Sequence, residues 1–114
     1  MLAKINRLKK EKDFKKIYKF GKKARGNFFM LKYSQTKLPY SRFGFVIPAN
    51  AIKKAVKRNL LKRRISEIFR LNLEKIKTGY DVVVLLFKSP DQDEYQFLEK
   101  EVLNLAKKTE IFKK

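Results

Sequence analysis

The sequence predicts a single α+β domain in which one small sheet is combined with an N-terminal helix, a basic helix and a C-terminal helix. Its 114 residues fit one compact domain, and a hydrophobic content of 44%, including 10 Phe and 5 Tyr, suffices for a core. Apolar residues recur at helical spacing in some segments and at strand spacing in others. No internal repeat or flexible linker divides the chain, so residues 1–114 are expected to fold as one unit.

The N-terminal helix is predicted over residues 11–20. Phe14, Ile17 and Tyr18 are spaced three and four residues apart, which places them on one face of a helix. Gly21 follows at a position where helices commonly end. The aromatic face either anchors this helix to the sheet or offers its rings to a ligand, and both interpretations remain open at this point.

Three strands are predicted, over residues 28–33, 42–47 and 80–87. The first alternates along its length, so that Lys32 faces away from the side chains that enter the core. The third is a continuous apolar run, which is typical of a strand that is buried on both faces. Together the strands predict one small sheet.

A long basic helix is predicted between the second and third strands, over residues 53–70, and a C-terminal helix is predicted to begin at Ser89 and Pro90. Acidic residues near that start are expected to stabilise the helix N-terminus rather than to bind a metal: Asp91, Asp93 and Glu94. The apolar stripe of the C-terminal helix consists of Tyr95, Leu98, Val102 and Leu105.

The basic helix divides into two arcs on a helical wheel. The predicted core-facing arc contains Leu60, Leu61, Ile65, Ile68 and Leu71. The opposite arc contains Arg58, Asn59, Lys62, Arg63, Ser66 and Arg70. Lys57 and Arg64 fall within the apolar arc, so either they extend past the edge of the core or the assumed phase is wrong by one residue. Cations on one face repel each other, whereas bound phosphates would attract all of them. The alternative is a basic helix that simply faces solvent.

The net charge of +19 lies entirely in the first 70 residues, which carry 22 basic and 3 acidic side chains, whereas residues 71–114 carry 8 of each sign. Such an imbalance on a small domain predicts a polyanionic partner, either nucleic acid or an anionic membrane. The longest apolar run, residues 82–87, is far too short to span a bilayer. We therefore expect a soluble, cytoplasmic protein without a membrane partner.

The chain contains no His and no Cys. This composition excludes His-based acid–base catalysis, thiol chemistry and metal sites that depend on His or Cys ligands. We expect no catalytic residues in this chain, and no metal ion or cofactor bound by the protein alone.

Residues 54–70 resemble the signature helix of the bacterial ribonuclease P protein subunit, which reads roughly A-V-x-R-N-[RK]-x-K-R-x-x-R-E-x-F. Three further segments resemble that family in the same order: residues 6–21 its opening, residues 41–44 (S-R-F-G) its S-R-[LF]-G strand, and residues 79–83 (G-Y-D-V-V) a later strand. The chain departs from the pattern at Leu60, Arg64 and Ser66, and residues 50–53 replace the K-K-x-G that precedes the helix in the family.

The resemblance implies a two-layer α/β sandwich whose small central sheet contains a left-handed βαβ connection, with the basic helix as the crossover. It also implies an accessory subunit of an endoribonuclease, in which a catalytic RNA holds Mg²⁺ and removes the 5′ leader of precursor tRNA. The protein would bind the catalytic RNA and the single-stranded leader and would aid the binding of substrate and Mg²⁺. No obligate protein partner is expected. The alternative function is a structural ribosomal protein that binds rRNA.

The residues expected to contact RNA follow from this resemblance. On the basic helix they are Lys54, Arg58, Asn59, Lys62, Arg63 and Arg70, with Lys57, Arg64 and Ser66 as further candidates. The leader cleft would be formed by the first helix and the sheet, with Phe14, Tyr18 and Lys32 lining it. Aromatic faces can stack on unpaired bases, and lysine can contact phosphate.

Overall fold

The computed structural model describes residues 2–92 and 94–113. Three α-helices and four strands follow the predicted order with one addition: α1 (Glu11–Phe20), β1 (Lys22–Arg25), β2 (Phe29–Gln35), β3 (Arg42–Val46), α2 (Ala55–Leu71), β4 (Tyr80–Leu86) and α3 (Tyr95–Lys107). Single 3-10 turns lie at Lys4–Asn6 and Leu73–Lys75. The predicted α+β class is confirmed.

The strands form one mixed sheet in the order β1-β2-β4-β3. The β1–β2 and β2–β4 pairs are antiparallel, whereas β3 and β4 are parallel neighbours. Parallel neighbours need a long crossover connection, and α2 provides it. In the central strand β4, every residue except Leu85 is buried, as its continuous apolar run predicted.

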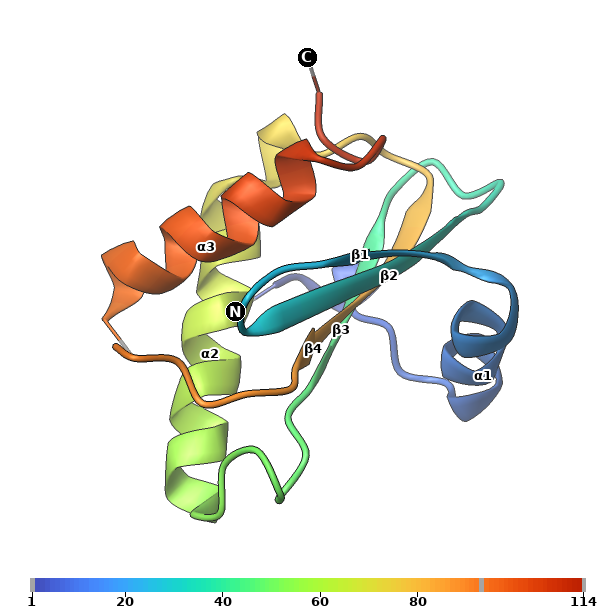
Figure 1. The fold of residues 1–114 in the computed structure, drawn as a ribbon. Coiled ribbons are helices and arrows are strands. Elements are labelled where there is room, and N and C mark those ends of the chain that lie inside the picture. Colours follow the sequence, from blue (N-terminus) through green and yellow to red (C-terminus); the bar gives the residue numbers. More distant parts are fainter. Residues whose placement is uncertain (1, 93, 114) are drawn as a thin grey trace.

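The two faces of the sheet carry different layers (Figure 1). Helices α2 and α3 cover one face and enclose the main core, which includes Phe29, Leu31 and Phe43. Helix α1 lies on the opposite face over a smaller apolar cluster around Ile17 and Val83. The N-terminal helix and the two later helices therefore pack on opposite sides of the sheet.

One strand was not predicted, and the predicted start of the last helix was wrong. Strand β1 was not predicted, because three of its four residues are charged and it is held at the sheet edge by backbone pairing with β2. Helix α3 begins at Tyr95 rather than at Ser89 and Pro90. Asp91 thus precedes the helix, Glu94 occupies the N-cap without a side-chain capping bond, and Asp93 lies outside the described residues.

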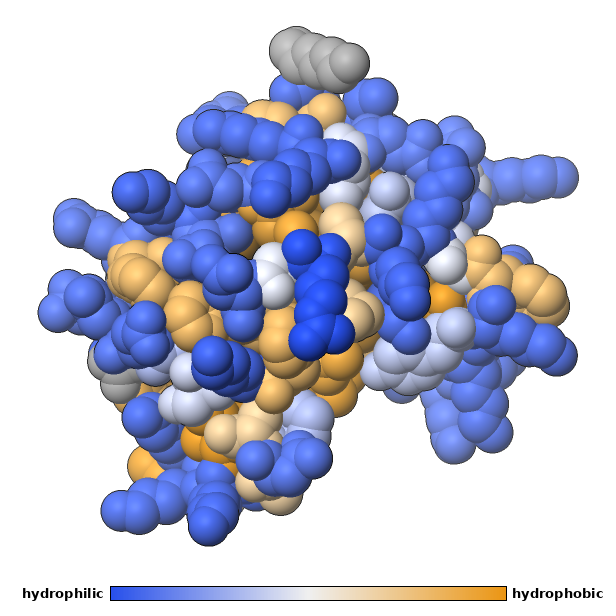
Figure 2. All heavy atoms as spheres, viewed as in Figure 1, coloured by the Kyte–Doolittle hydropathy of each residue, from blue (hydrophilic) through white to orange (hydrophobic). Residues whose placement is uncertain are grey.

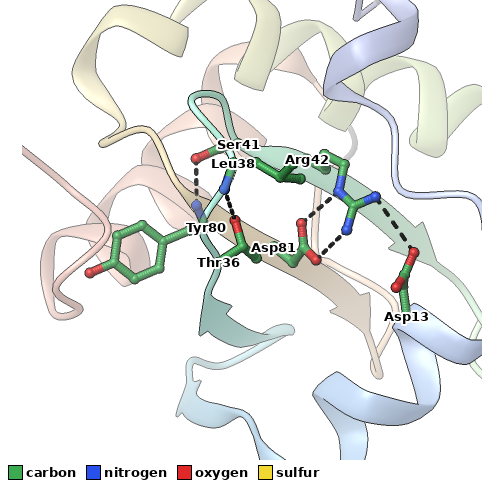
Figure 3. A network of polar contacts seen from close by, with 7 residues as sticks. All are labelled: Asp13, Thr36, Leu38, Ser41, Arg42, Tyr80 and Asp81. Carbon is green, nitrogen blue, oxygen red and sulfur yellow. Dashed lines mark hydrogen bonds and ion pairs between the residues drawn. The ribbon is translucent and has the colours of Figure 1, made fainter.

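Polar side chains of residues 41–44 and 79–83 connect β3, β4 and α1 (Figure 3). The Arg42 guanidinium donates from Nε and Nη2 to the two carboxylate oxygens of Asp81, at 2.8 and 2.6 Å, and so joins β3 to β4. Hydrogen bonding to Asp81 raises the pKa of Arg42. Its Nη1 lies 3.5 Å from the Asp13 carboxylate on α1. The Ser41 hydroxyl donates to the Lys77 carbonyl at 2.6 Å and accepts from the Tyr80 amide at 3.0 Å. These side chains therefore have structural roles.

Candidate nucleic-acid interface

Helix α2 is rotated about its axis relative to the orientation that the helical wheel predicted. Phe69 is fully buried against β3, whereas Leu71, predicted to face the core, is 53% exposed. Ser66, predicted to lie on the outer arc, is only 8% exposed. The rotation leaves Asn59, Arg63 and Arg70 on the outer side of α2, all exposed.

The remaining polar residues of α2 lie on its two flanks. Lys62 and Ser66 face a hollow beside β3. On the other flank, Arg64 lines a shallow hollow with Tyr95 of α3, and Lys57 shares this side because it lies two turns earlier. Both Lys57 and Arg64 are half-buried at the margin of the core, as the first interpretation of the wheel expected, and the positions of Ser66 and Leu71 show that the assumed phase was also wrong.

The hollow beside β3 has a volume of about 260 Å³ and is lined by three segments that are distant in sequence. The segment before α1 runs along the edge of β3, where the Leu8 amide donates to the Phe43 carbonyl at 2.9 Å. Aromatic and aliphatic side chains form the wall of the hollow. Its cations come from the N-terminal segment and from α2: Arg7, Lys9, Lys62 and Arg63. Sequence reasoning missed Arg7 and Lys9, although both lie in the strongly basic N-terminal stretch.

Arg58 is held by the backbone of its own chain. Its Nη1 donates to the carbonyl oxygens of Ile52 at 2.7 Å and Lys53 at 2.8 Å. Ile52 is buried, whereas Lys53 and Lys54 are exposed. Arg58 therefore fixes the loop that leads into α2, in the stretch where the sequence departs from the family pattern.

The outer cations of α2 differ in whether their charge is already compensated. Arg70 donates to the Glu67 carboxylate, and this hydrogen bond is the main cause of the low pKa of Glu67, about 2. By contrast, the side chains of Lys54, Lys62 and Arg63 have no ion-pair or hydrogen-bond partner among the described residues. These three cations are therefore available to phosphate groups.

The predicted leader-cleft residues lie on the α1 side of the sheet. Phe14 packs against Gly44, and the neighbouring Ile17 is buried, so both anchor α1. Tyr18 is 42% exposed, and Lys32 Nζ lies 5.0 Å from the centre of its ring. Partial burial raises the pKa of the Tyr18 hydroxyl, so the ring remains neutral at physiological pH. The structure thus separates the anchoring aromatic from the accessible one.

The same sheet face carries a second aromatic–cation pair. Arg25 of β1 lies 4.2 Å from the centre of the Phe87 ring, and Lys23 is the register partner of Lys32. Lys23 and Arg25 were missed because β1 was not predicted. We call Tyr18, Lys23, Arg25, Lys32 and Phe87 the open sheet face.

Metal ligands do not gather in the part of the chain that the structure describes. Among residues 2–92 and 94–113, no group of three or more Asp or Glu side chains could hold a metal ion, and the sequence has no His or Cys. Within these residues, no helix combines the length and hydrophobicity needed to cross a membrane.

Comparison with known proteins gives one family. The sequence model of the family described as Ribonuclease P matches residues 2–110. The ribonuclease P protein component of Clostridioides difficile strain 630 is 38% identical over 105 residues, which cover 91% of each chain. That of Fusobacterium nucleatum is 36% identical over 111 residues, covering 94% of this chain and 99% of the relative.

Solved structures agree with these sequence relatives. The ribonuclease P protein of Staphylococcus aureus superposes with a TM-score of 0.84 at 27% identity, covering 94% of this chain and 97% of that one. The ribonuclease P protein of Thermotoga maritima superposes with a TM-score of 0.80 at 33% identity, covering 91% and 97%.

Proposed function

The chain belongs to the ribonuclease P protein family, and we propose that, as the protein component of this tRNA-processing endoribonuclease, it binds RNA through two separate cationic surfaces. One surface is on α2 and would hold the catalytic RNA. The other is the open sheet face, which would hold the 5′ leader of precursor tRNA. Because the chain belongs to this family, the alternative function as a structural ribosomal protein is no longer needed.

The uncompensated cations of α2 support the first contact. Lys62 and Arg63 lie at the hollow beside β3, and Lys54 is the N-cap residue that precedes the same helix. Arginine can grip a phosphate with two parallel hydrogen bonds, and lysine adds a point charge. The amide of Asn59, exposed on the same outer side as Arg63, can bond a sugar or a base edge. These residues could bind the sugar–phosphate backbone of a folded RNA.

The open sheet face suits a single strand. Its exposed tyrosine ring can stack on an unpaired base, and the lysines and arginine around it can track the phosphates. Tyr18 and Lys32 are the central pair, because the lysine ammonium already lies over the ring. Phe14 anchors α1 to β3 and would thereby position Tyr18 at this surface.

In this proposal the protein performs no bond chemistry. Mg²⁺ held by RNA phosphates supplies the activated water when bound. The protein's cations would lower the repulsion between the phosphates of substrate and catalytic RNA and so reduce the Mg²⁺ needed for binding. Precursor tRNA is a cytoplasmic RNA in bacteria, so the protein would work there, without a further protein subunit.

The observation that carries the proposal is the uncompensated pair Lys62 and Arg63. The affinity of the full-length protein for ribonuclease P RNA tests it. We expect the double variant Lys62→Ala/Arg63→Ala to bind roughly tenfold to hundredfold more weakly and to show a shallower salt dependence, by about 0.7–0.9 per lost phosphate contact. The matched control is Lys100→Ala/Lys107→Ala on the electroneutral C-terminal third. Equal losses in both variants would contradict the proposal.

The leader contact is tested with two substrates. Precursor tRNA with a leader and mature tRNA without one are bound to the holoenzyme containing Tyr18→Ala/Lys32→Ala. We expect weaker binding of the precursor only. An equal loss for both RNAs would show that the open sheet face does not bind the leader.

A further inference from the structure

A third cationic surface lies on the flank of α1 opposite Tyr18, and neither proposed RNA contact uses it. A hollow of about 390 Å³ separates α1 from the turn between β2 and β3. Four lysines line it: Lys10, Lys12, Lys16 and Lys37. Within the described residues none of these lysines forms an ion pair with a carboxylate. Their mutual repulsion is therefore not relieved by the protein itself.

Two carboxylates, Asp13 and Asp81, line the same hollow, and both are occupied by Arg42 (Figure 3). The Arg42–Asp81 contact is bidentate, at 2.6 and 2.8 Å, and the Arg42–Asp13 contact is 3.5 Å long. The five cations of the lining outnumber the two anions. An anion that enters this hollow therefore meets a net positive charge.

An exposed aromatic ring lies next to the lysine-lined hollow. Phe20, the last residue of α1, is 71% exposed, and Lys19 Nζ lies 5.4 Å from the centre of its ring. Phe20 lines a second hollow that includes Ser34, and Ser34 also lines the lysine-lined hollow. Both hollows therefore border Ser34, and Phe20 lies one helical turn after Lys16 on α1. Figure 2 shows α1 largely covered by hydrophilic side chains, with an apolar area where it leads into β1.

We propose that this flank, consisting of Phe20 with Lys12, Lys16 and Lys37, is an additional binding site for unpaired RNA. A base would stack on the open ring of Phe20, and the neighbouring phosphates would lie on the three lysines. One exposed Phe is too small an apolar surface to anchor the protein in a membrane, whereas it is the size of one base. The site rests on the proposed function only in that its ligand is RNA.

The RNA could come from two sources, a leader that continues past the open sheet face or an unpaired segment of the catalytic RNA. Helix α1 separates the two surfaces, because Tyr18 and Phe20 point to different sides of it. A leader must therefore be long enough to pass around α1, whereas the catalytic RNA has no such requirement.

The test uses the full-length protein with Phe20→Ala and, separately, with Lys12→Ala/Lys16→Ala/Lys37→Ala. Each is titrated into ribonuclease P RNA, and each holoenzyme is titrated with precursor tRNAs that carry short or long leaders. In one of these arms we expect Phe20→Ala to weaken binding roughly fivefold to 50-fold and Phe20→Tyr to bind as the wild type does. The triple variant should lower the salt slope by about 2. Loss with RNA alone identifies the catalytic RNA, and loss only with long leaders identifies the substrate.

Unchanged affinity in every arm would overturn the inference. The variant Lys62→Ala/Arg63→Ala is measured in the same assays. If it loses affinity while the flank variants do not, the additional site is wrong and the proposed function stands. If neither loses affinity, both are wrong. Because Phe20 is exposed, its substitution is expected to leave the urea midpoint unchanged, which excludes unfolding as the cause of a loss.

Discussion

The ring of Phe14 lies against the backbone of Gly44, so closely that a Cβ at Gly44 would come within 2.5 Å of Phe14 Cζ. This contact seats α1 on the sheet and, with it, both surfaces that α1 borders. We expect Gly44→Ala to lower the free energy of unfolding by ~1–3 kcal/mol, because either the ring or the helix must move. Urea denaturation measures this.

The control for Gly44 is Gly26→Ala, where the nearest atom would lie 3.5 Å away in ordinary contact. Its effect on stability should be much smaller. Phe14→Leu combined with Gly44→Ala should recover part of the loss. If Gly44→Ala and Gly26→Ala behave alike, the ring does not determine where α1 sits.

The Arg42–Asp81 pair is predicted to be the most important polar contact of the sheet. Asp81 is buried, so Asp81→Asn leaves the Arg42 charge poorly compensated, and we expect a loss of ~2–4 kcal/mol. Glu67→Gln breaks an exposed pair with Arg70, which solvent screens, and should cost much less than Asp81→Asn. Equal unfolding midpoints for the two variants would contradict this ranking.

The Glu67–Arg70 pair predicts a small acid dependence of stability. The pKa of Glu67 is about 2 in the folded protein, against an ordinary value of 4.5, with the Arg70 hydrogen bond as the main cause. A depressed pKa stabilises the fold above pH 4.5, and this contribution is lost as the pH falls toward 2. Wild type should therefore lose slightly more stability than Glu67→Gln across this range, and added salt should shrink the difference. Identical pH profiles at low salt would show that the pair is not formed.

Arg58 and Arg63 should affect RNA binding in different ways. Arg58→Ala frees the loop before α2, so we expect faster hydrogen exchange at the amides of Ala51 and Ile52, which bond to the Pro48 carbonyl, together with weaker RNA binding. Arg63→Ala should weaken RNA binding without changing exchange in this loop. If Arg58→Ala leaves hydrogen exchange in this loop unchanged, its effect on RNA binding would indicate that Arg58 contacts RNA directly.

Local sequence patterns were enough to predict α1, β2 and β4. Helix α1 and strand β2 each bury a face whose spacing is visible in the sequence, and β4 is a continuous apolar run. The phase of α2 was not visible in this way. It is determined by Phe69, whose ring packs against Phe43 at 4.9 Å and Phe45 at 5.9 Å between centroids. Both partners are on β3, so the rotation that buries Ser66 follows from tertiary packing.

The cationic surfaces were predicted in part. The basic stretch around Lys62 and Arg63 was recognisable from its residues, and the structure leaves both side chains without a partner among the described residues. That Arg58 binds backbone carbonyls depends on the loop conformation, which no residue pattern specifies. Arg25 was missed for a similar reason, since its strand is defined by pairing with β2 rather than by its own composition.

Cleavage of precursor tRNA at low Mg²⁺ tests most directly whether the protein contributes RNA binding while the RNA performs catalysis. Ribonuclease P RNA is assayed alone, with the protein, and with Lys62→Ala/Arg63→Ala, and the protein is assayed without RNA. We predict that the protein restores cleavage at an Mg²⁺ concentration where the RNA alone is nearly inactive, that the double variant restores much less, and that the protein alone cleaves nothing. Cleavage by the protein without RNA, or full restoration by the double variant, would contradict the roles proposed here.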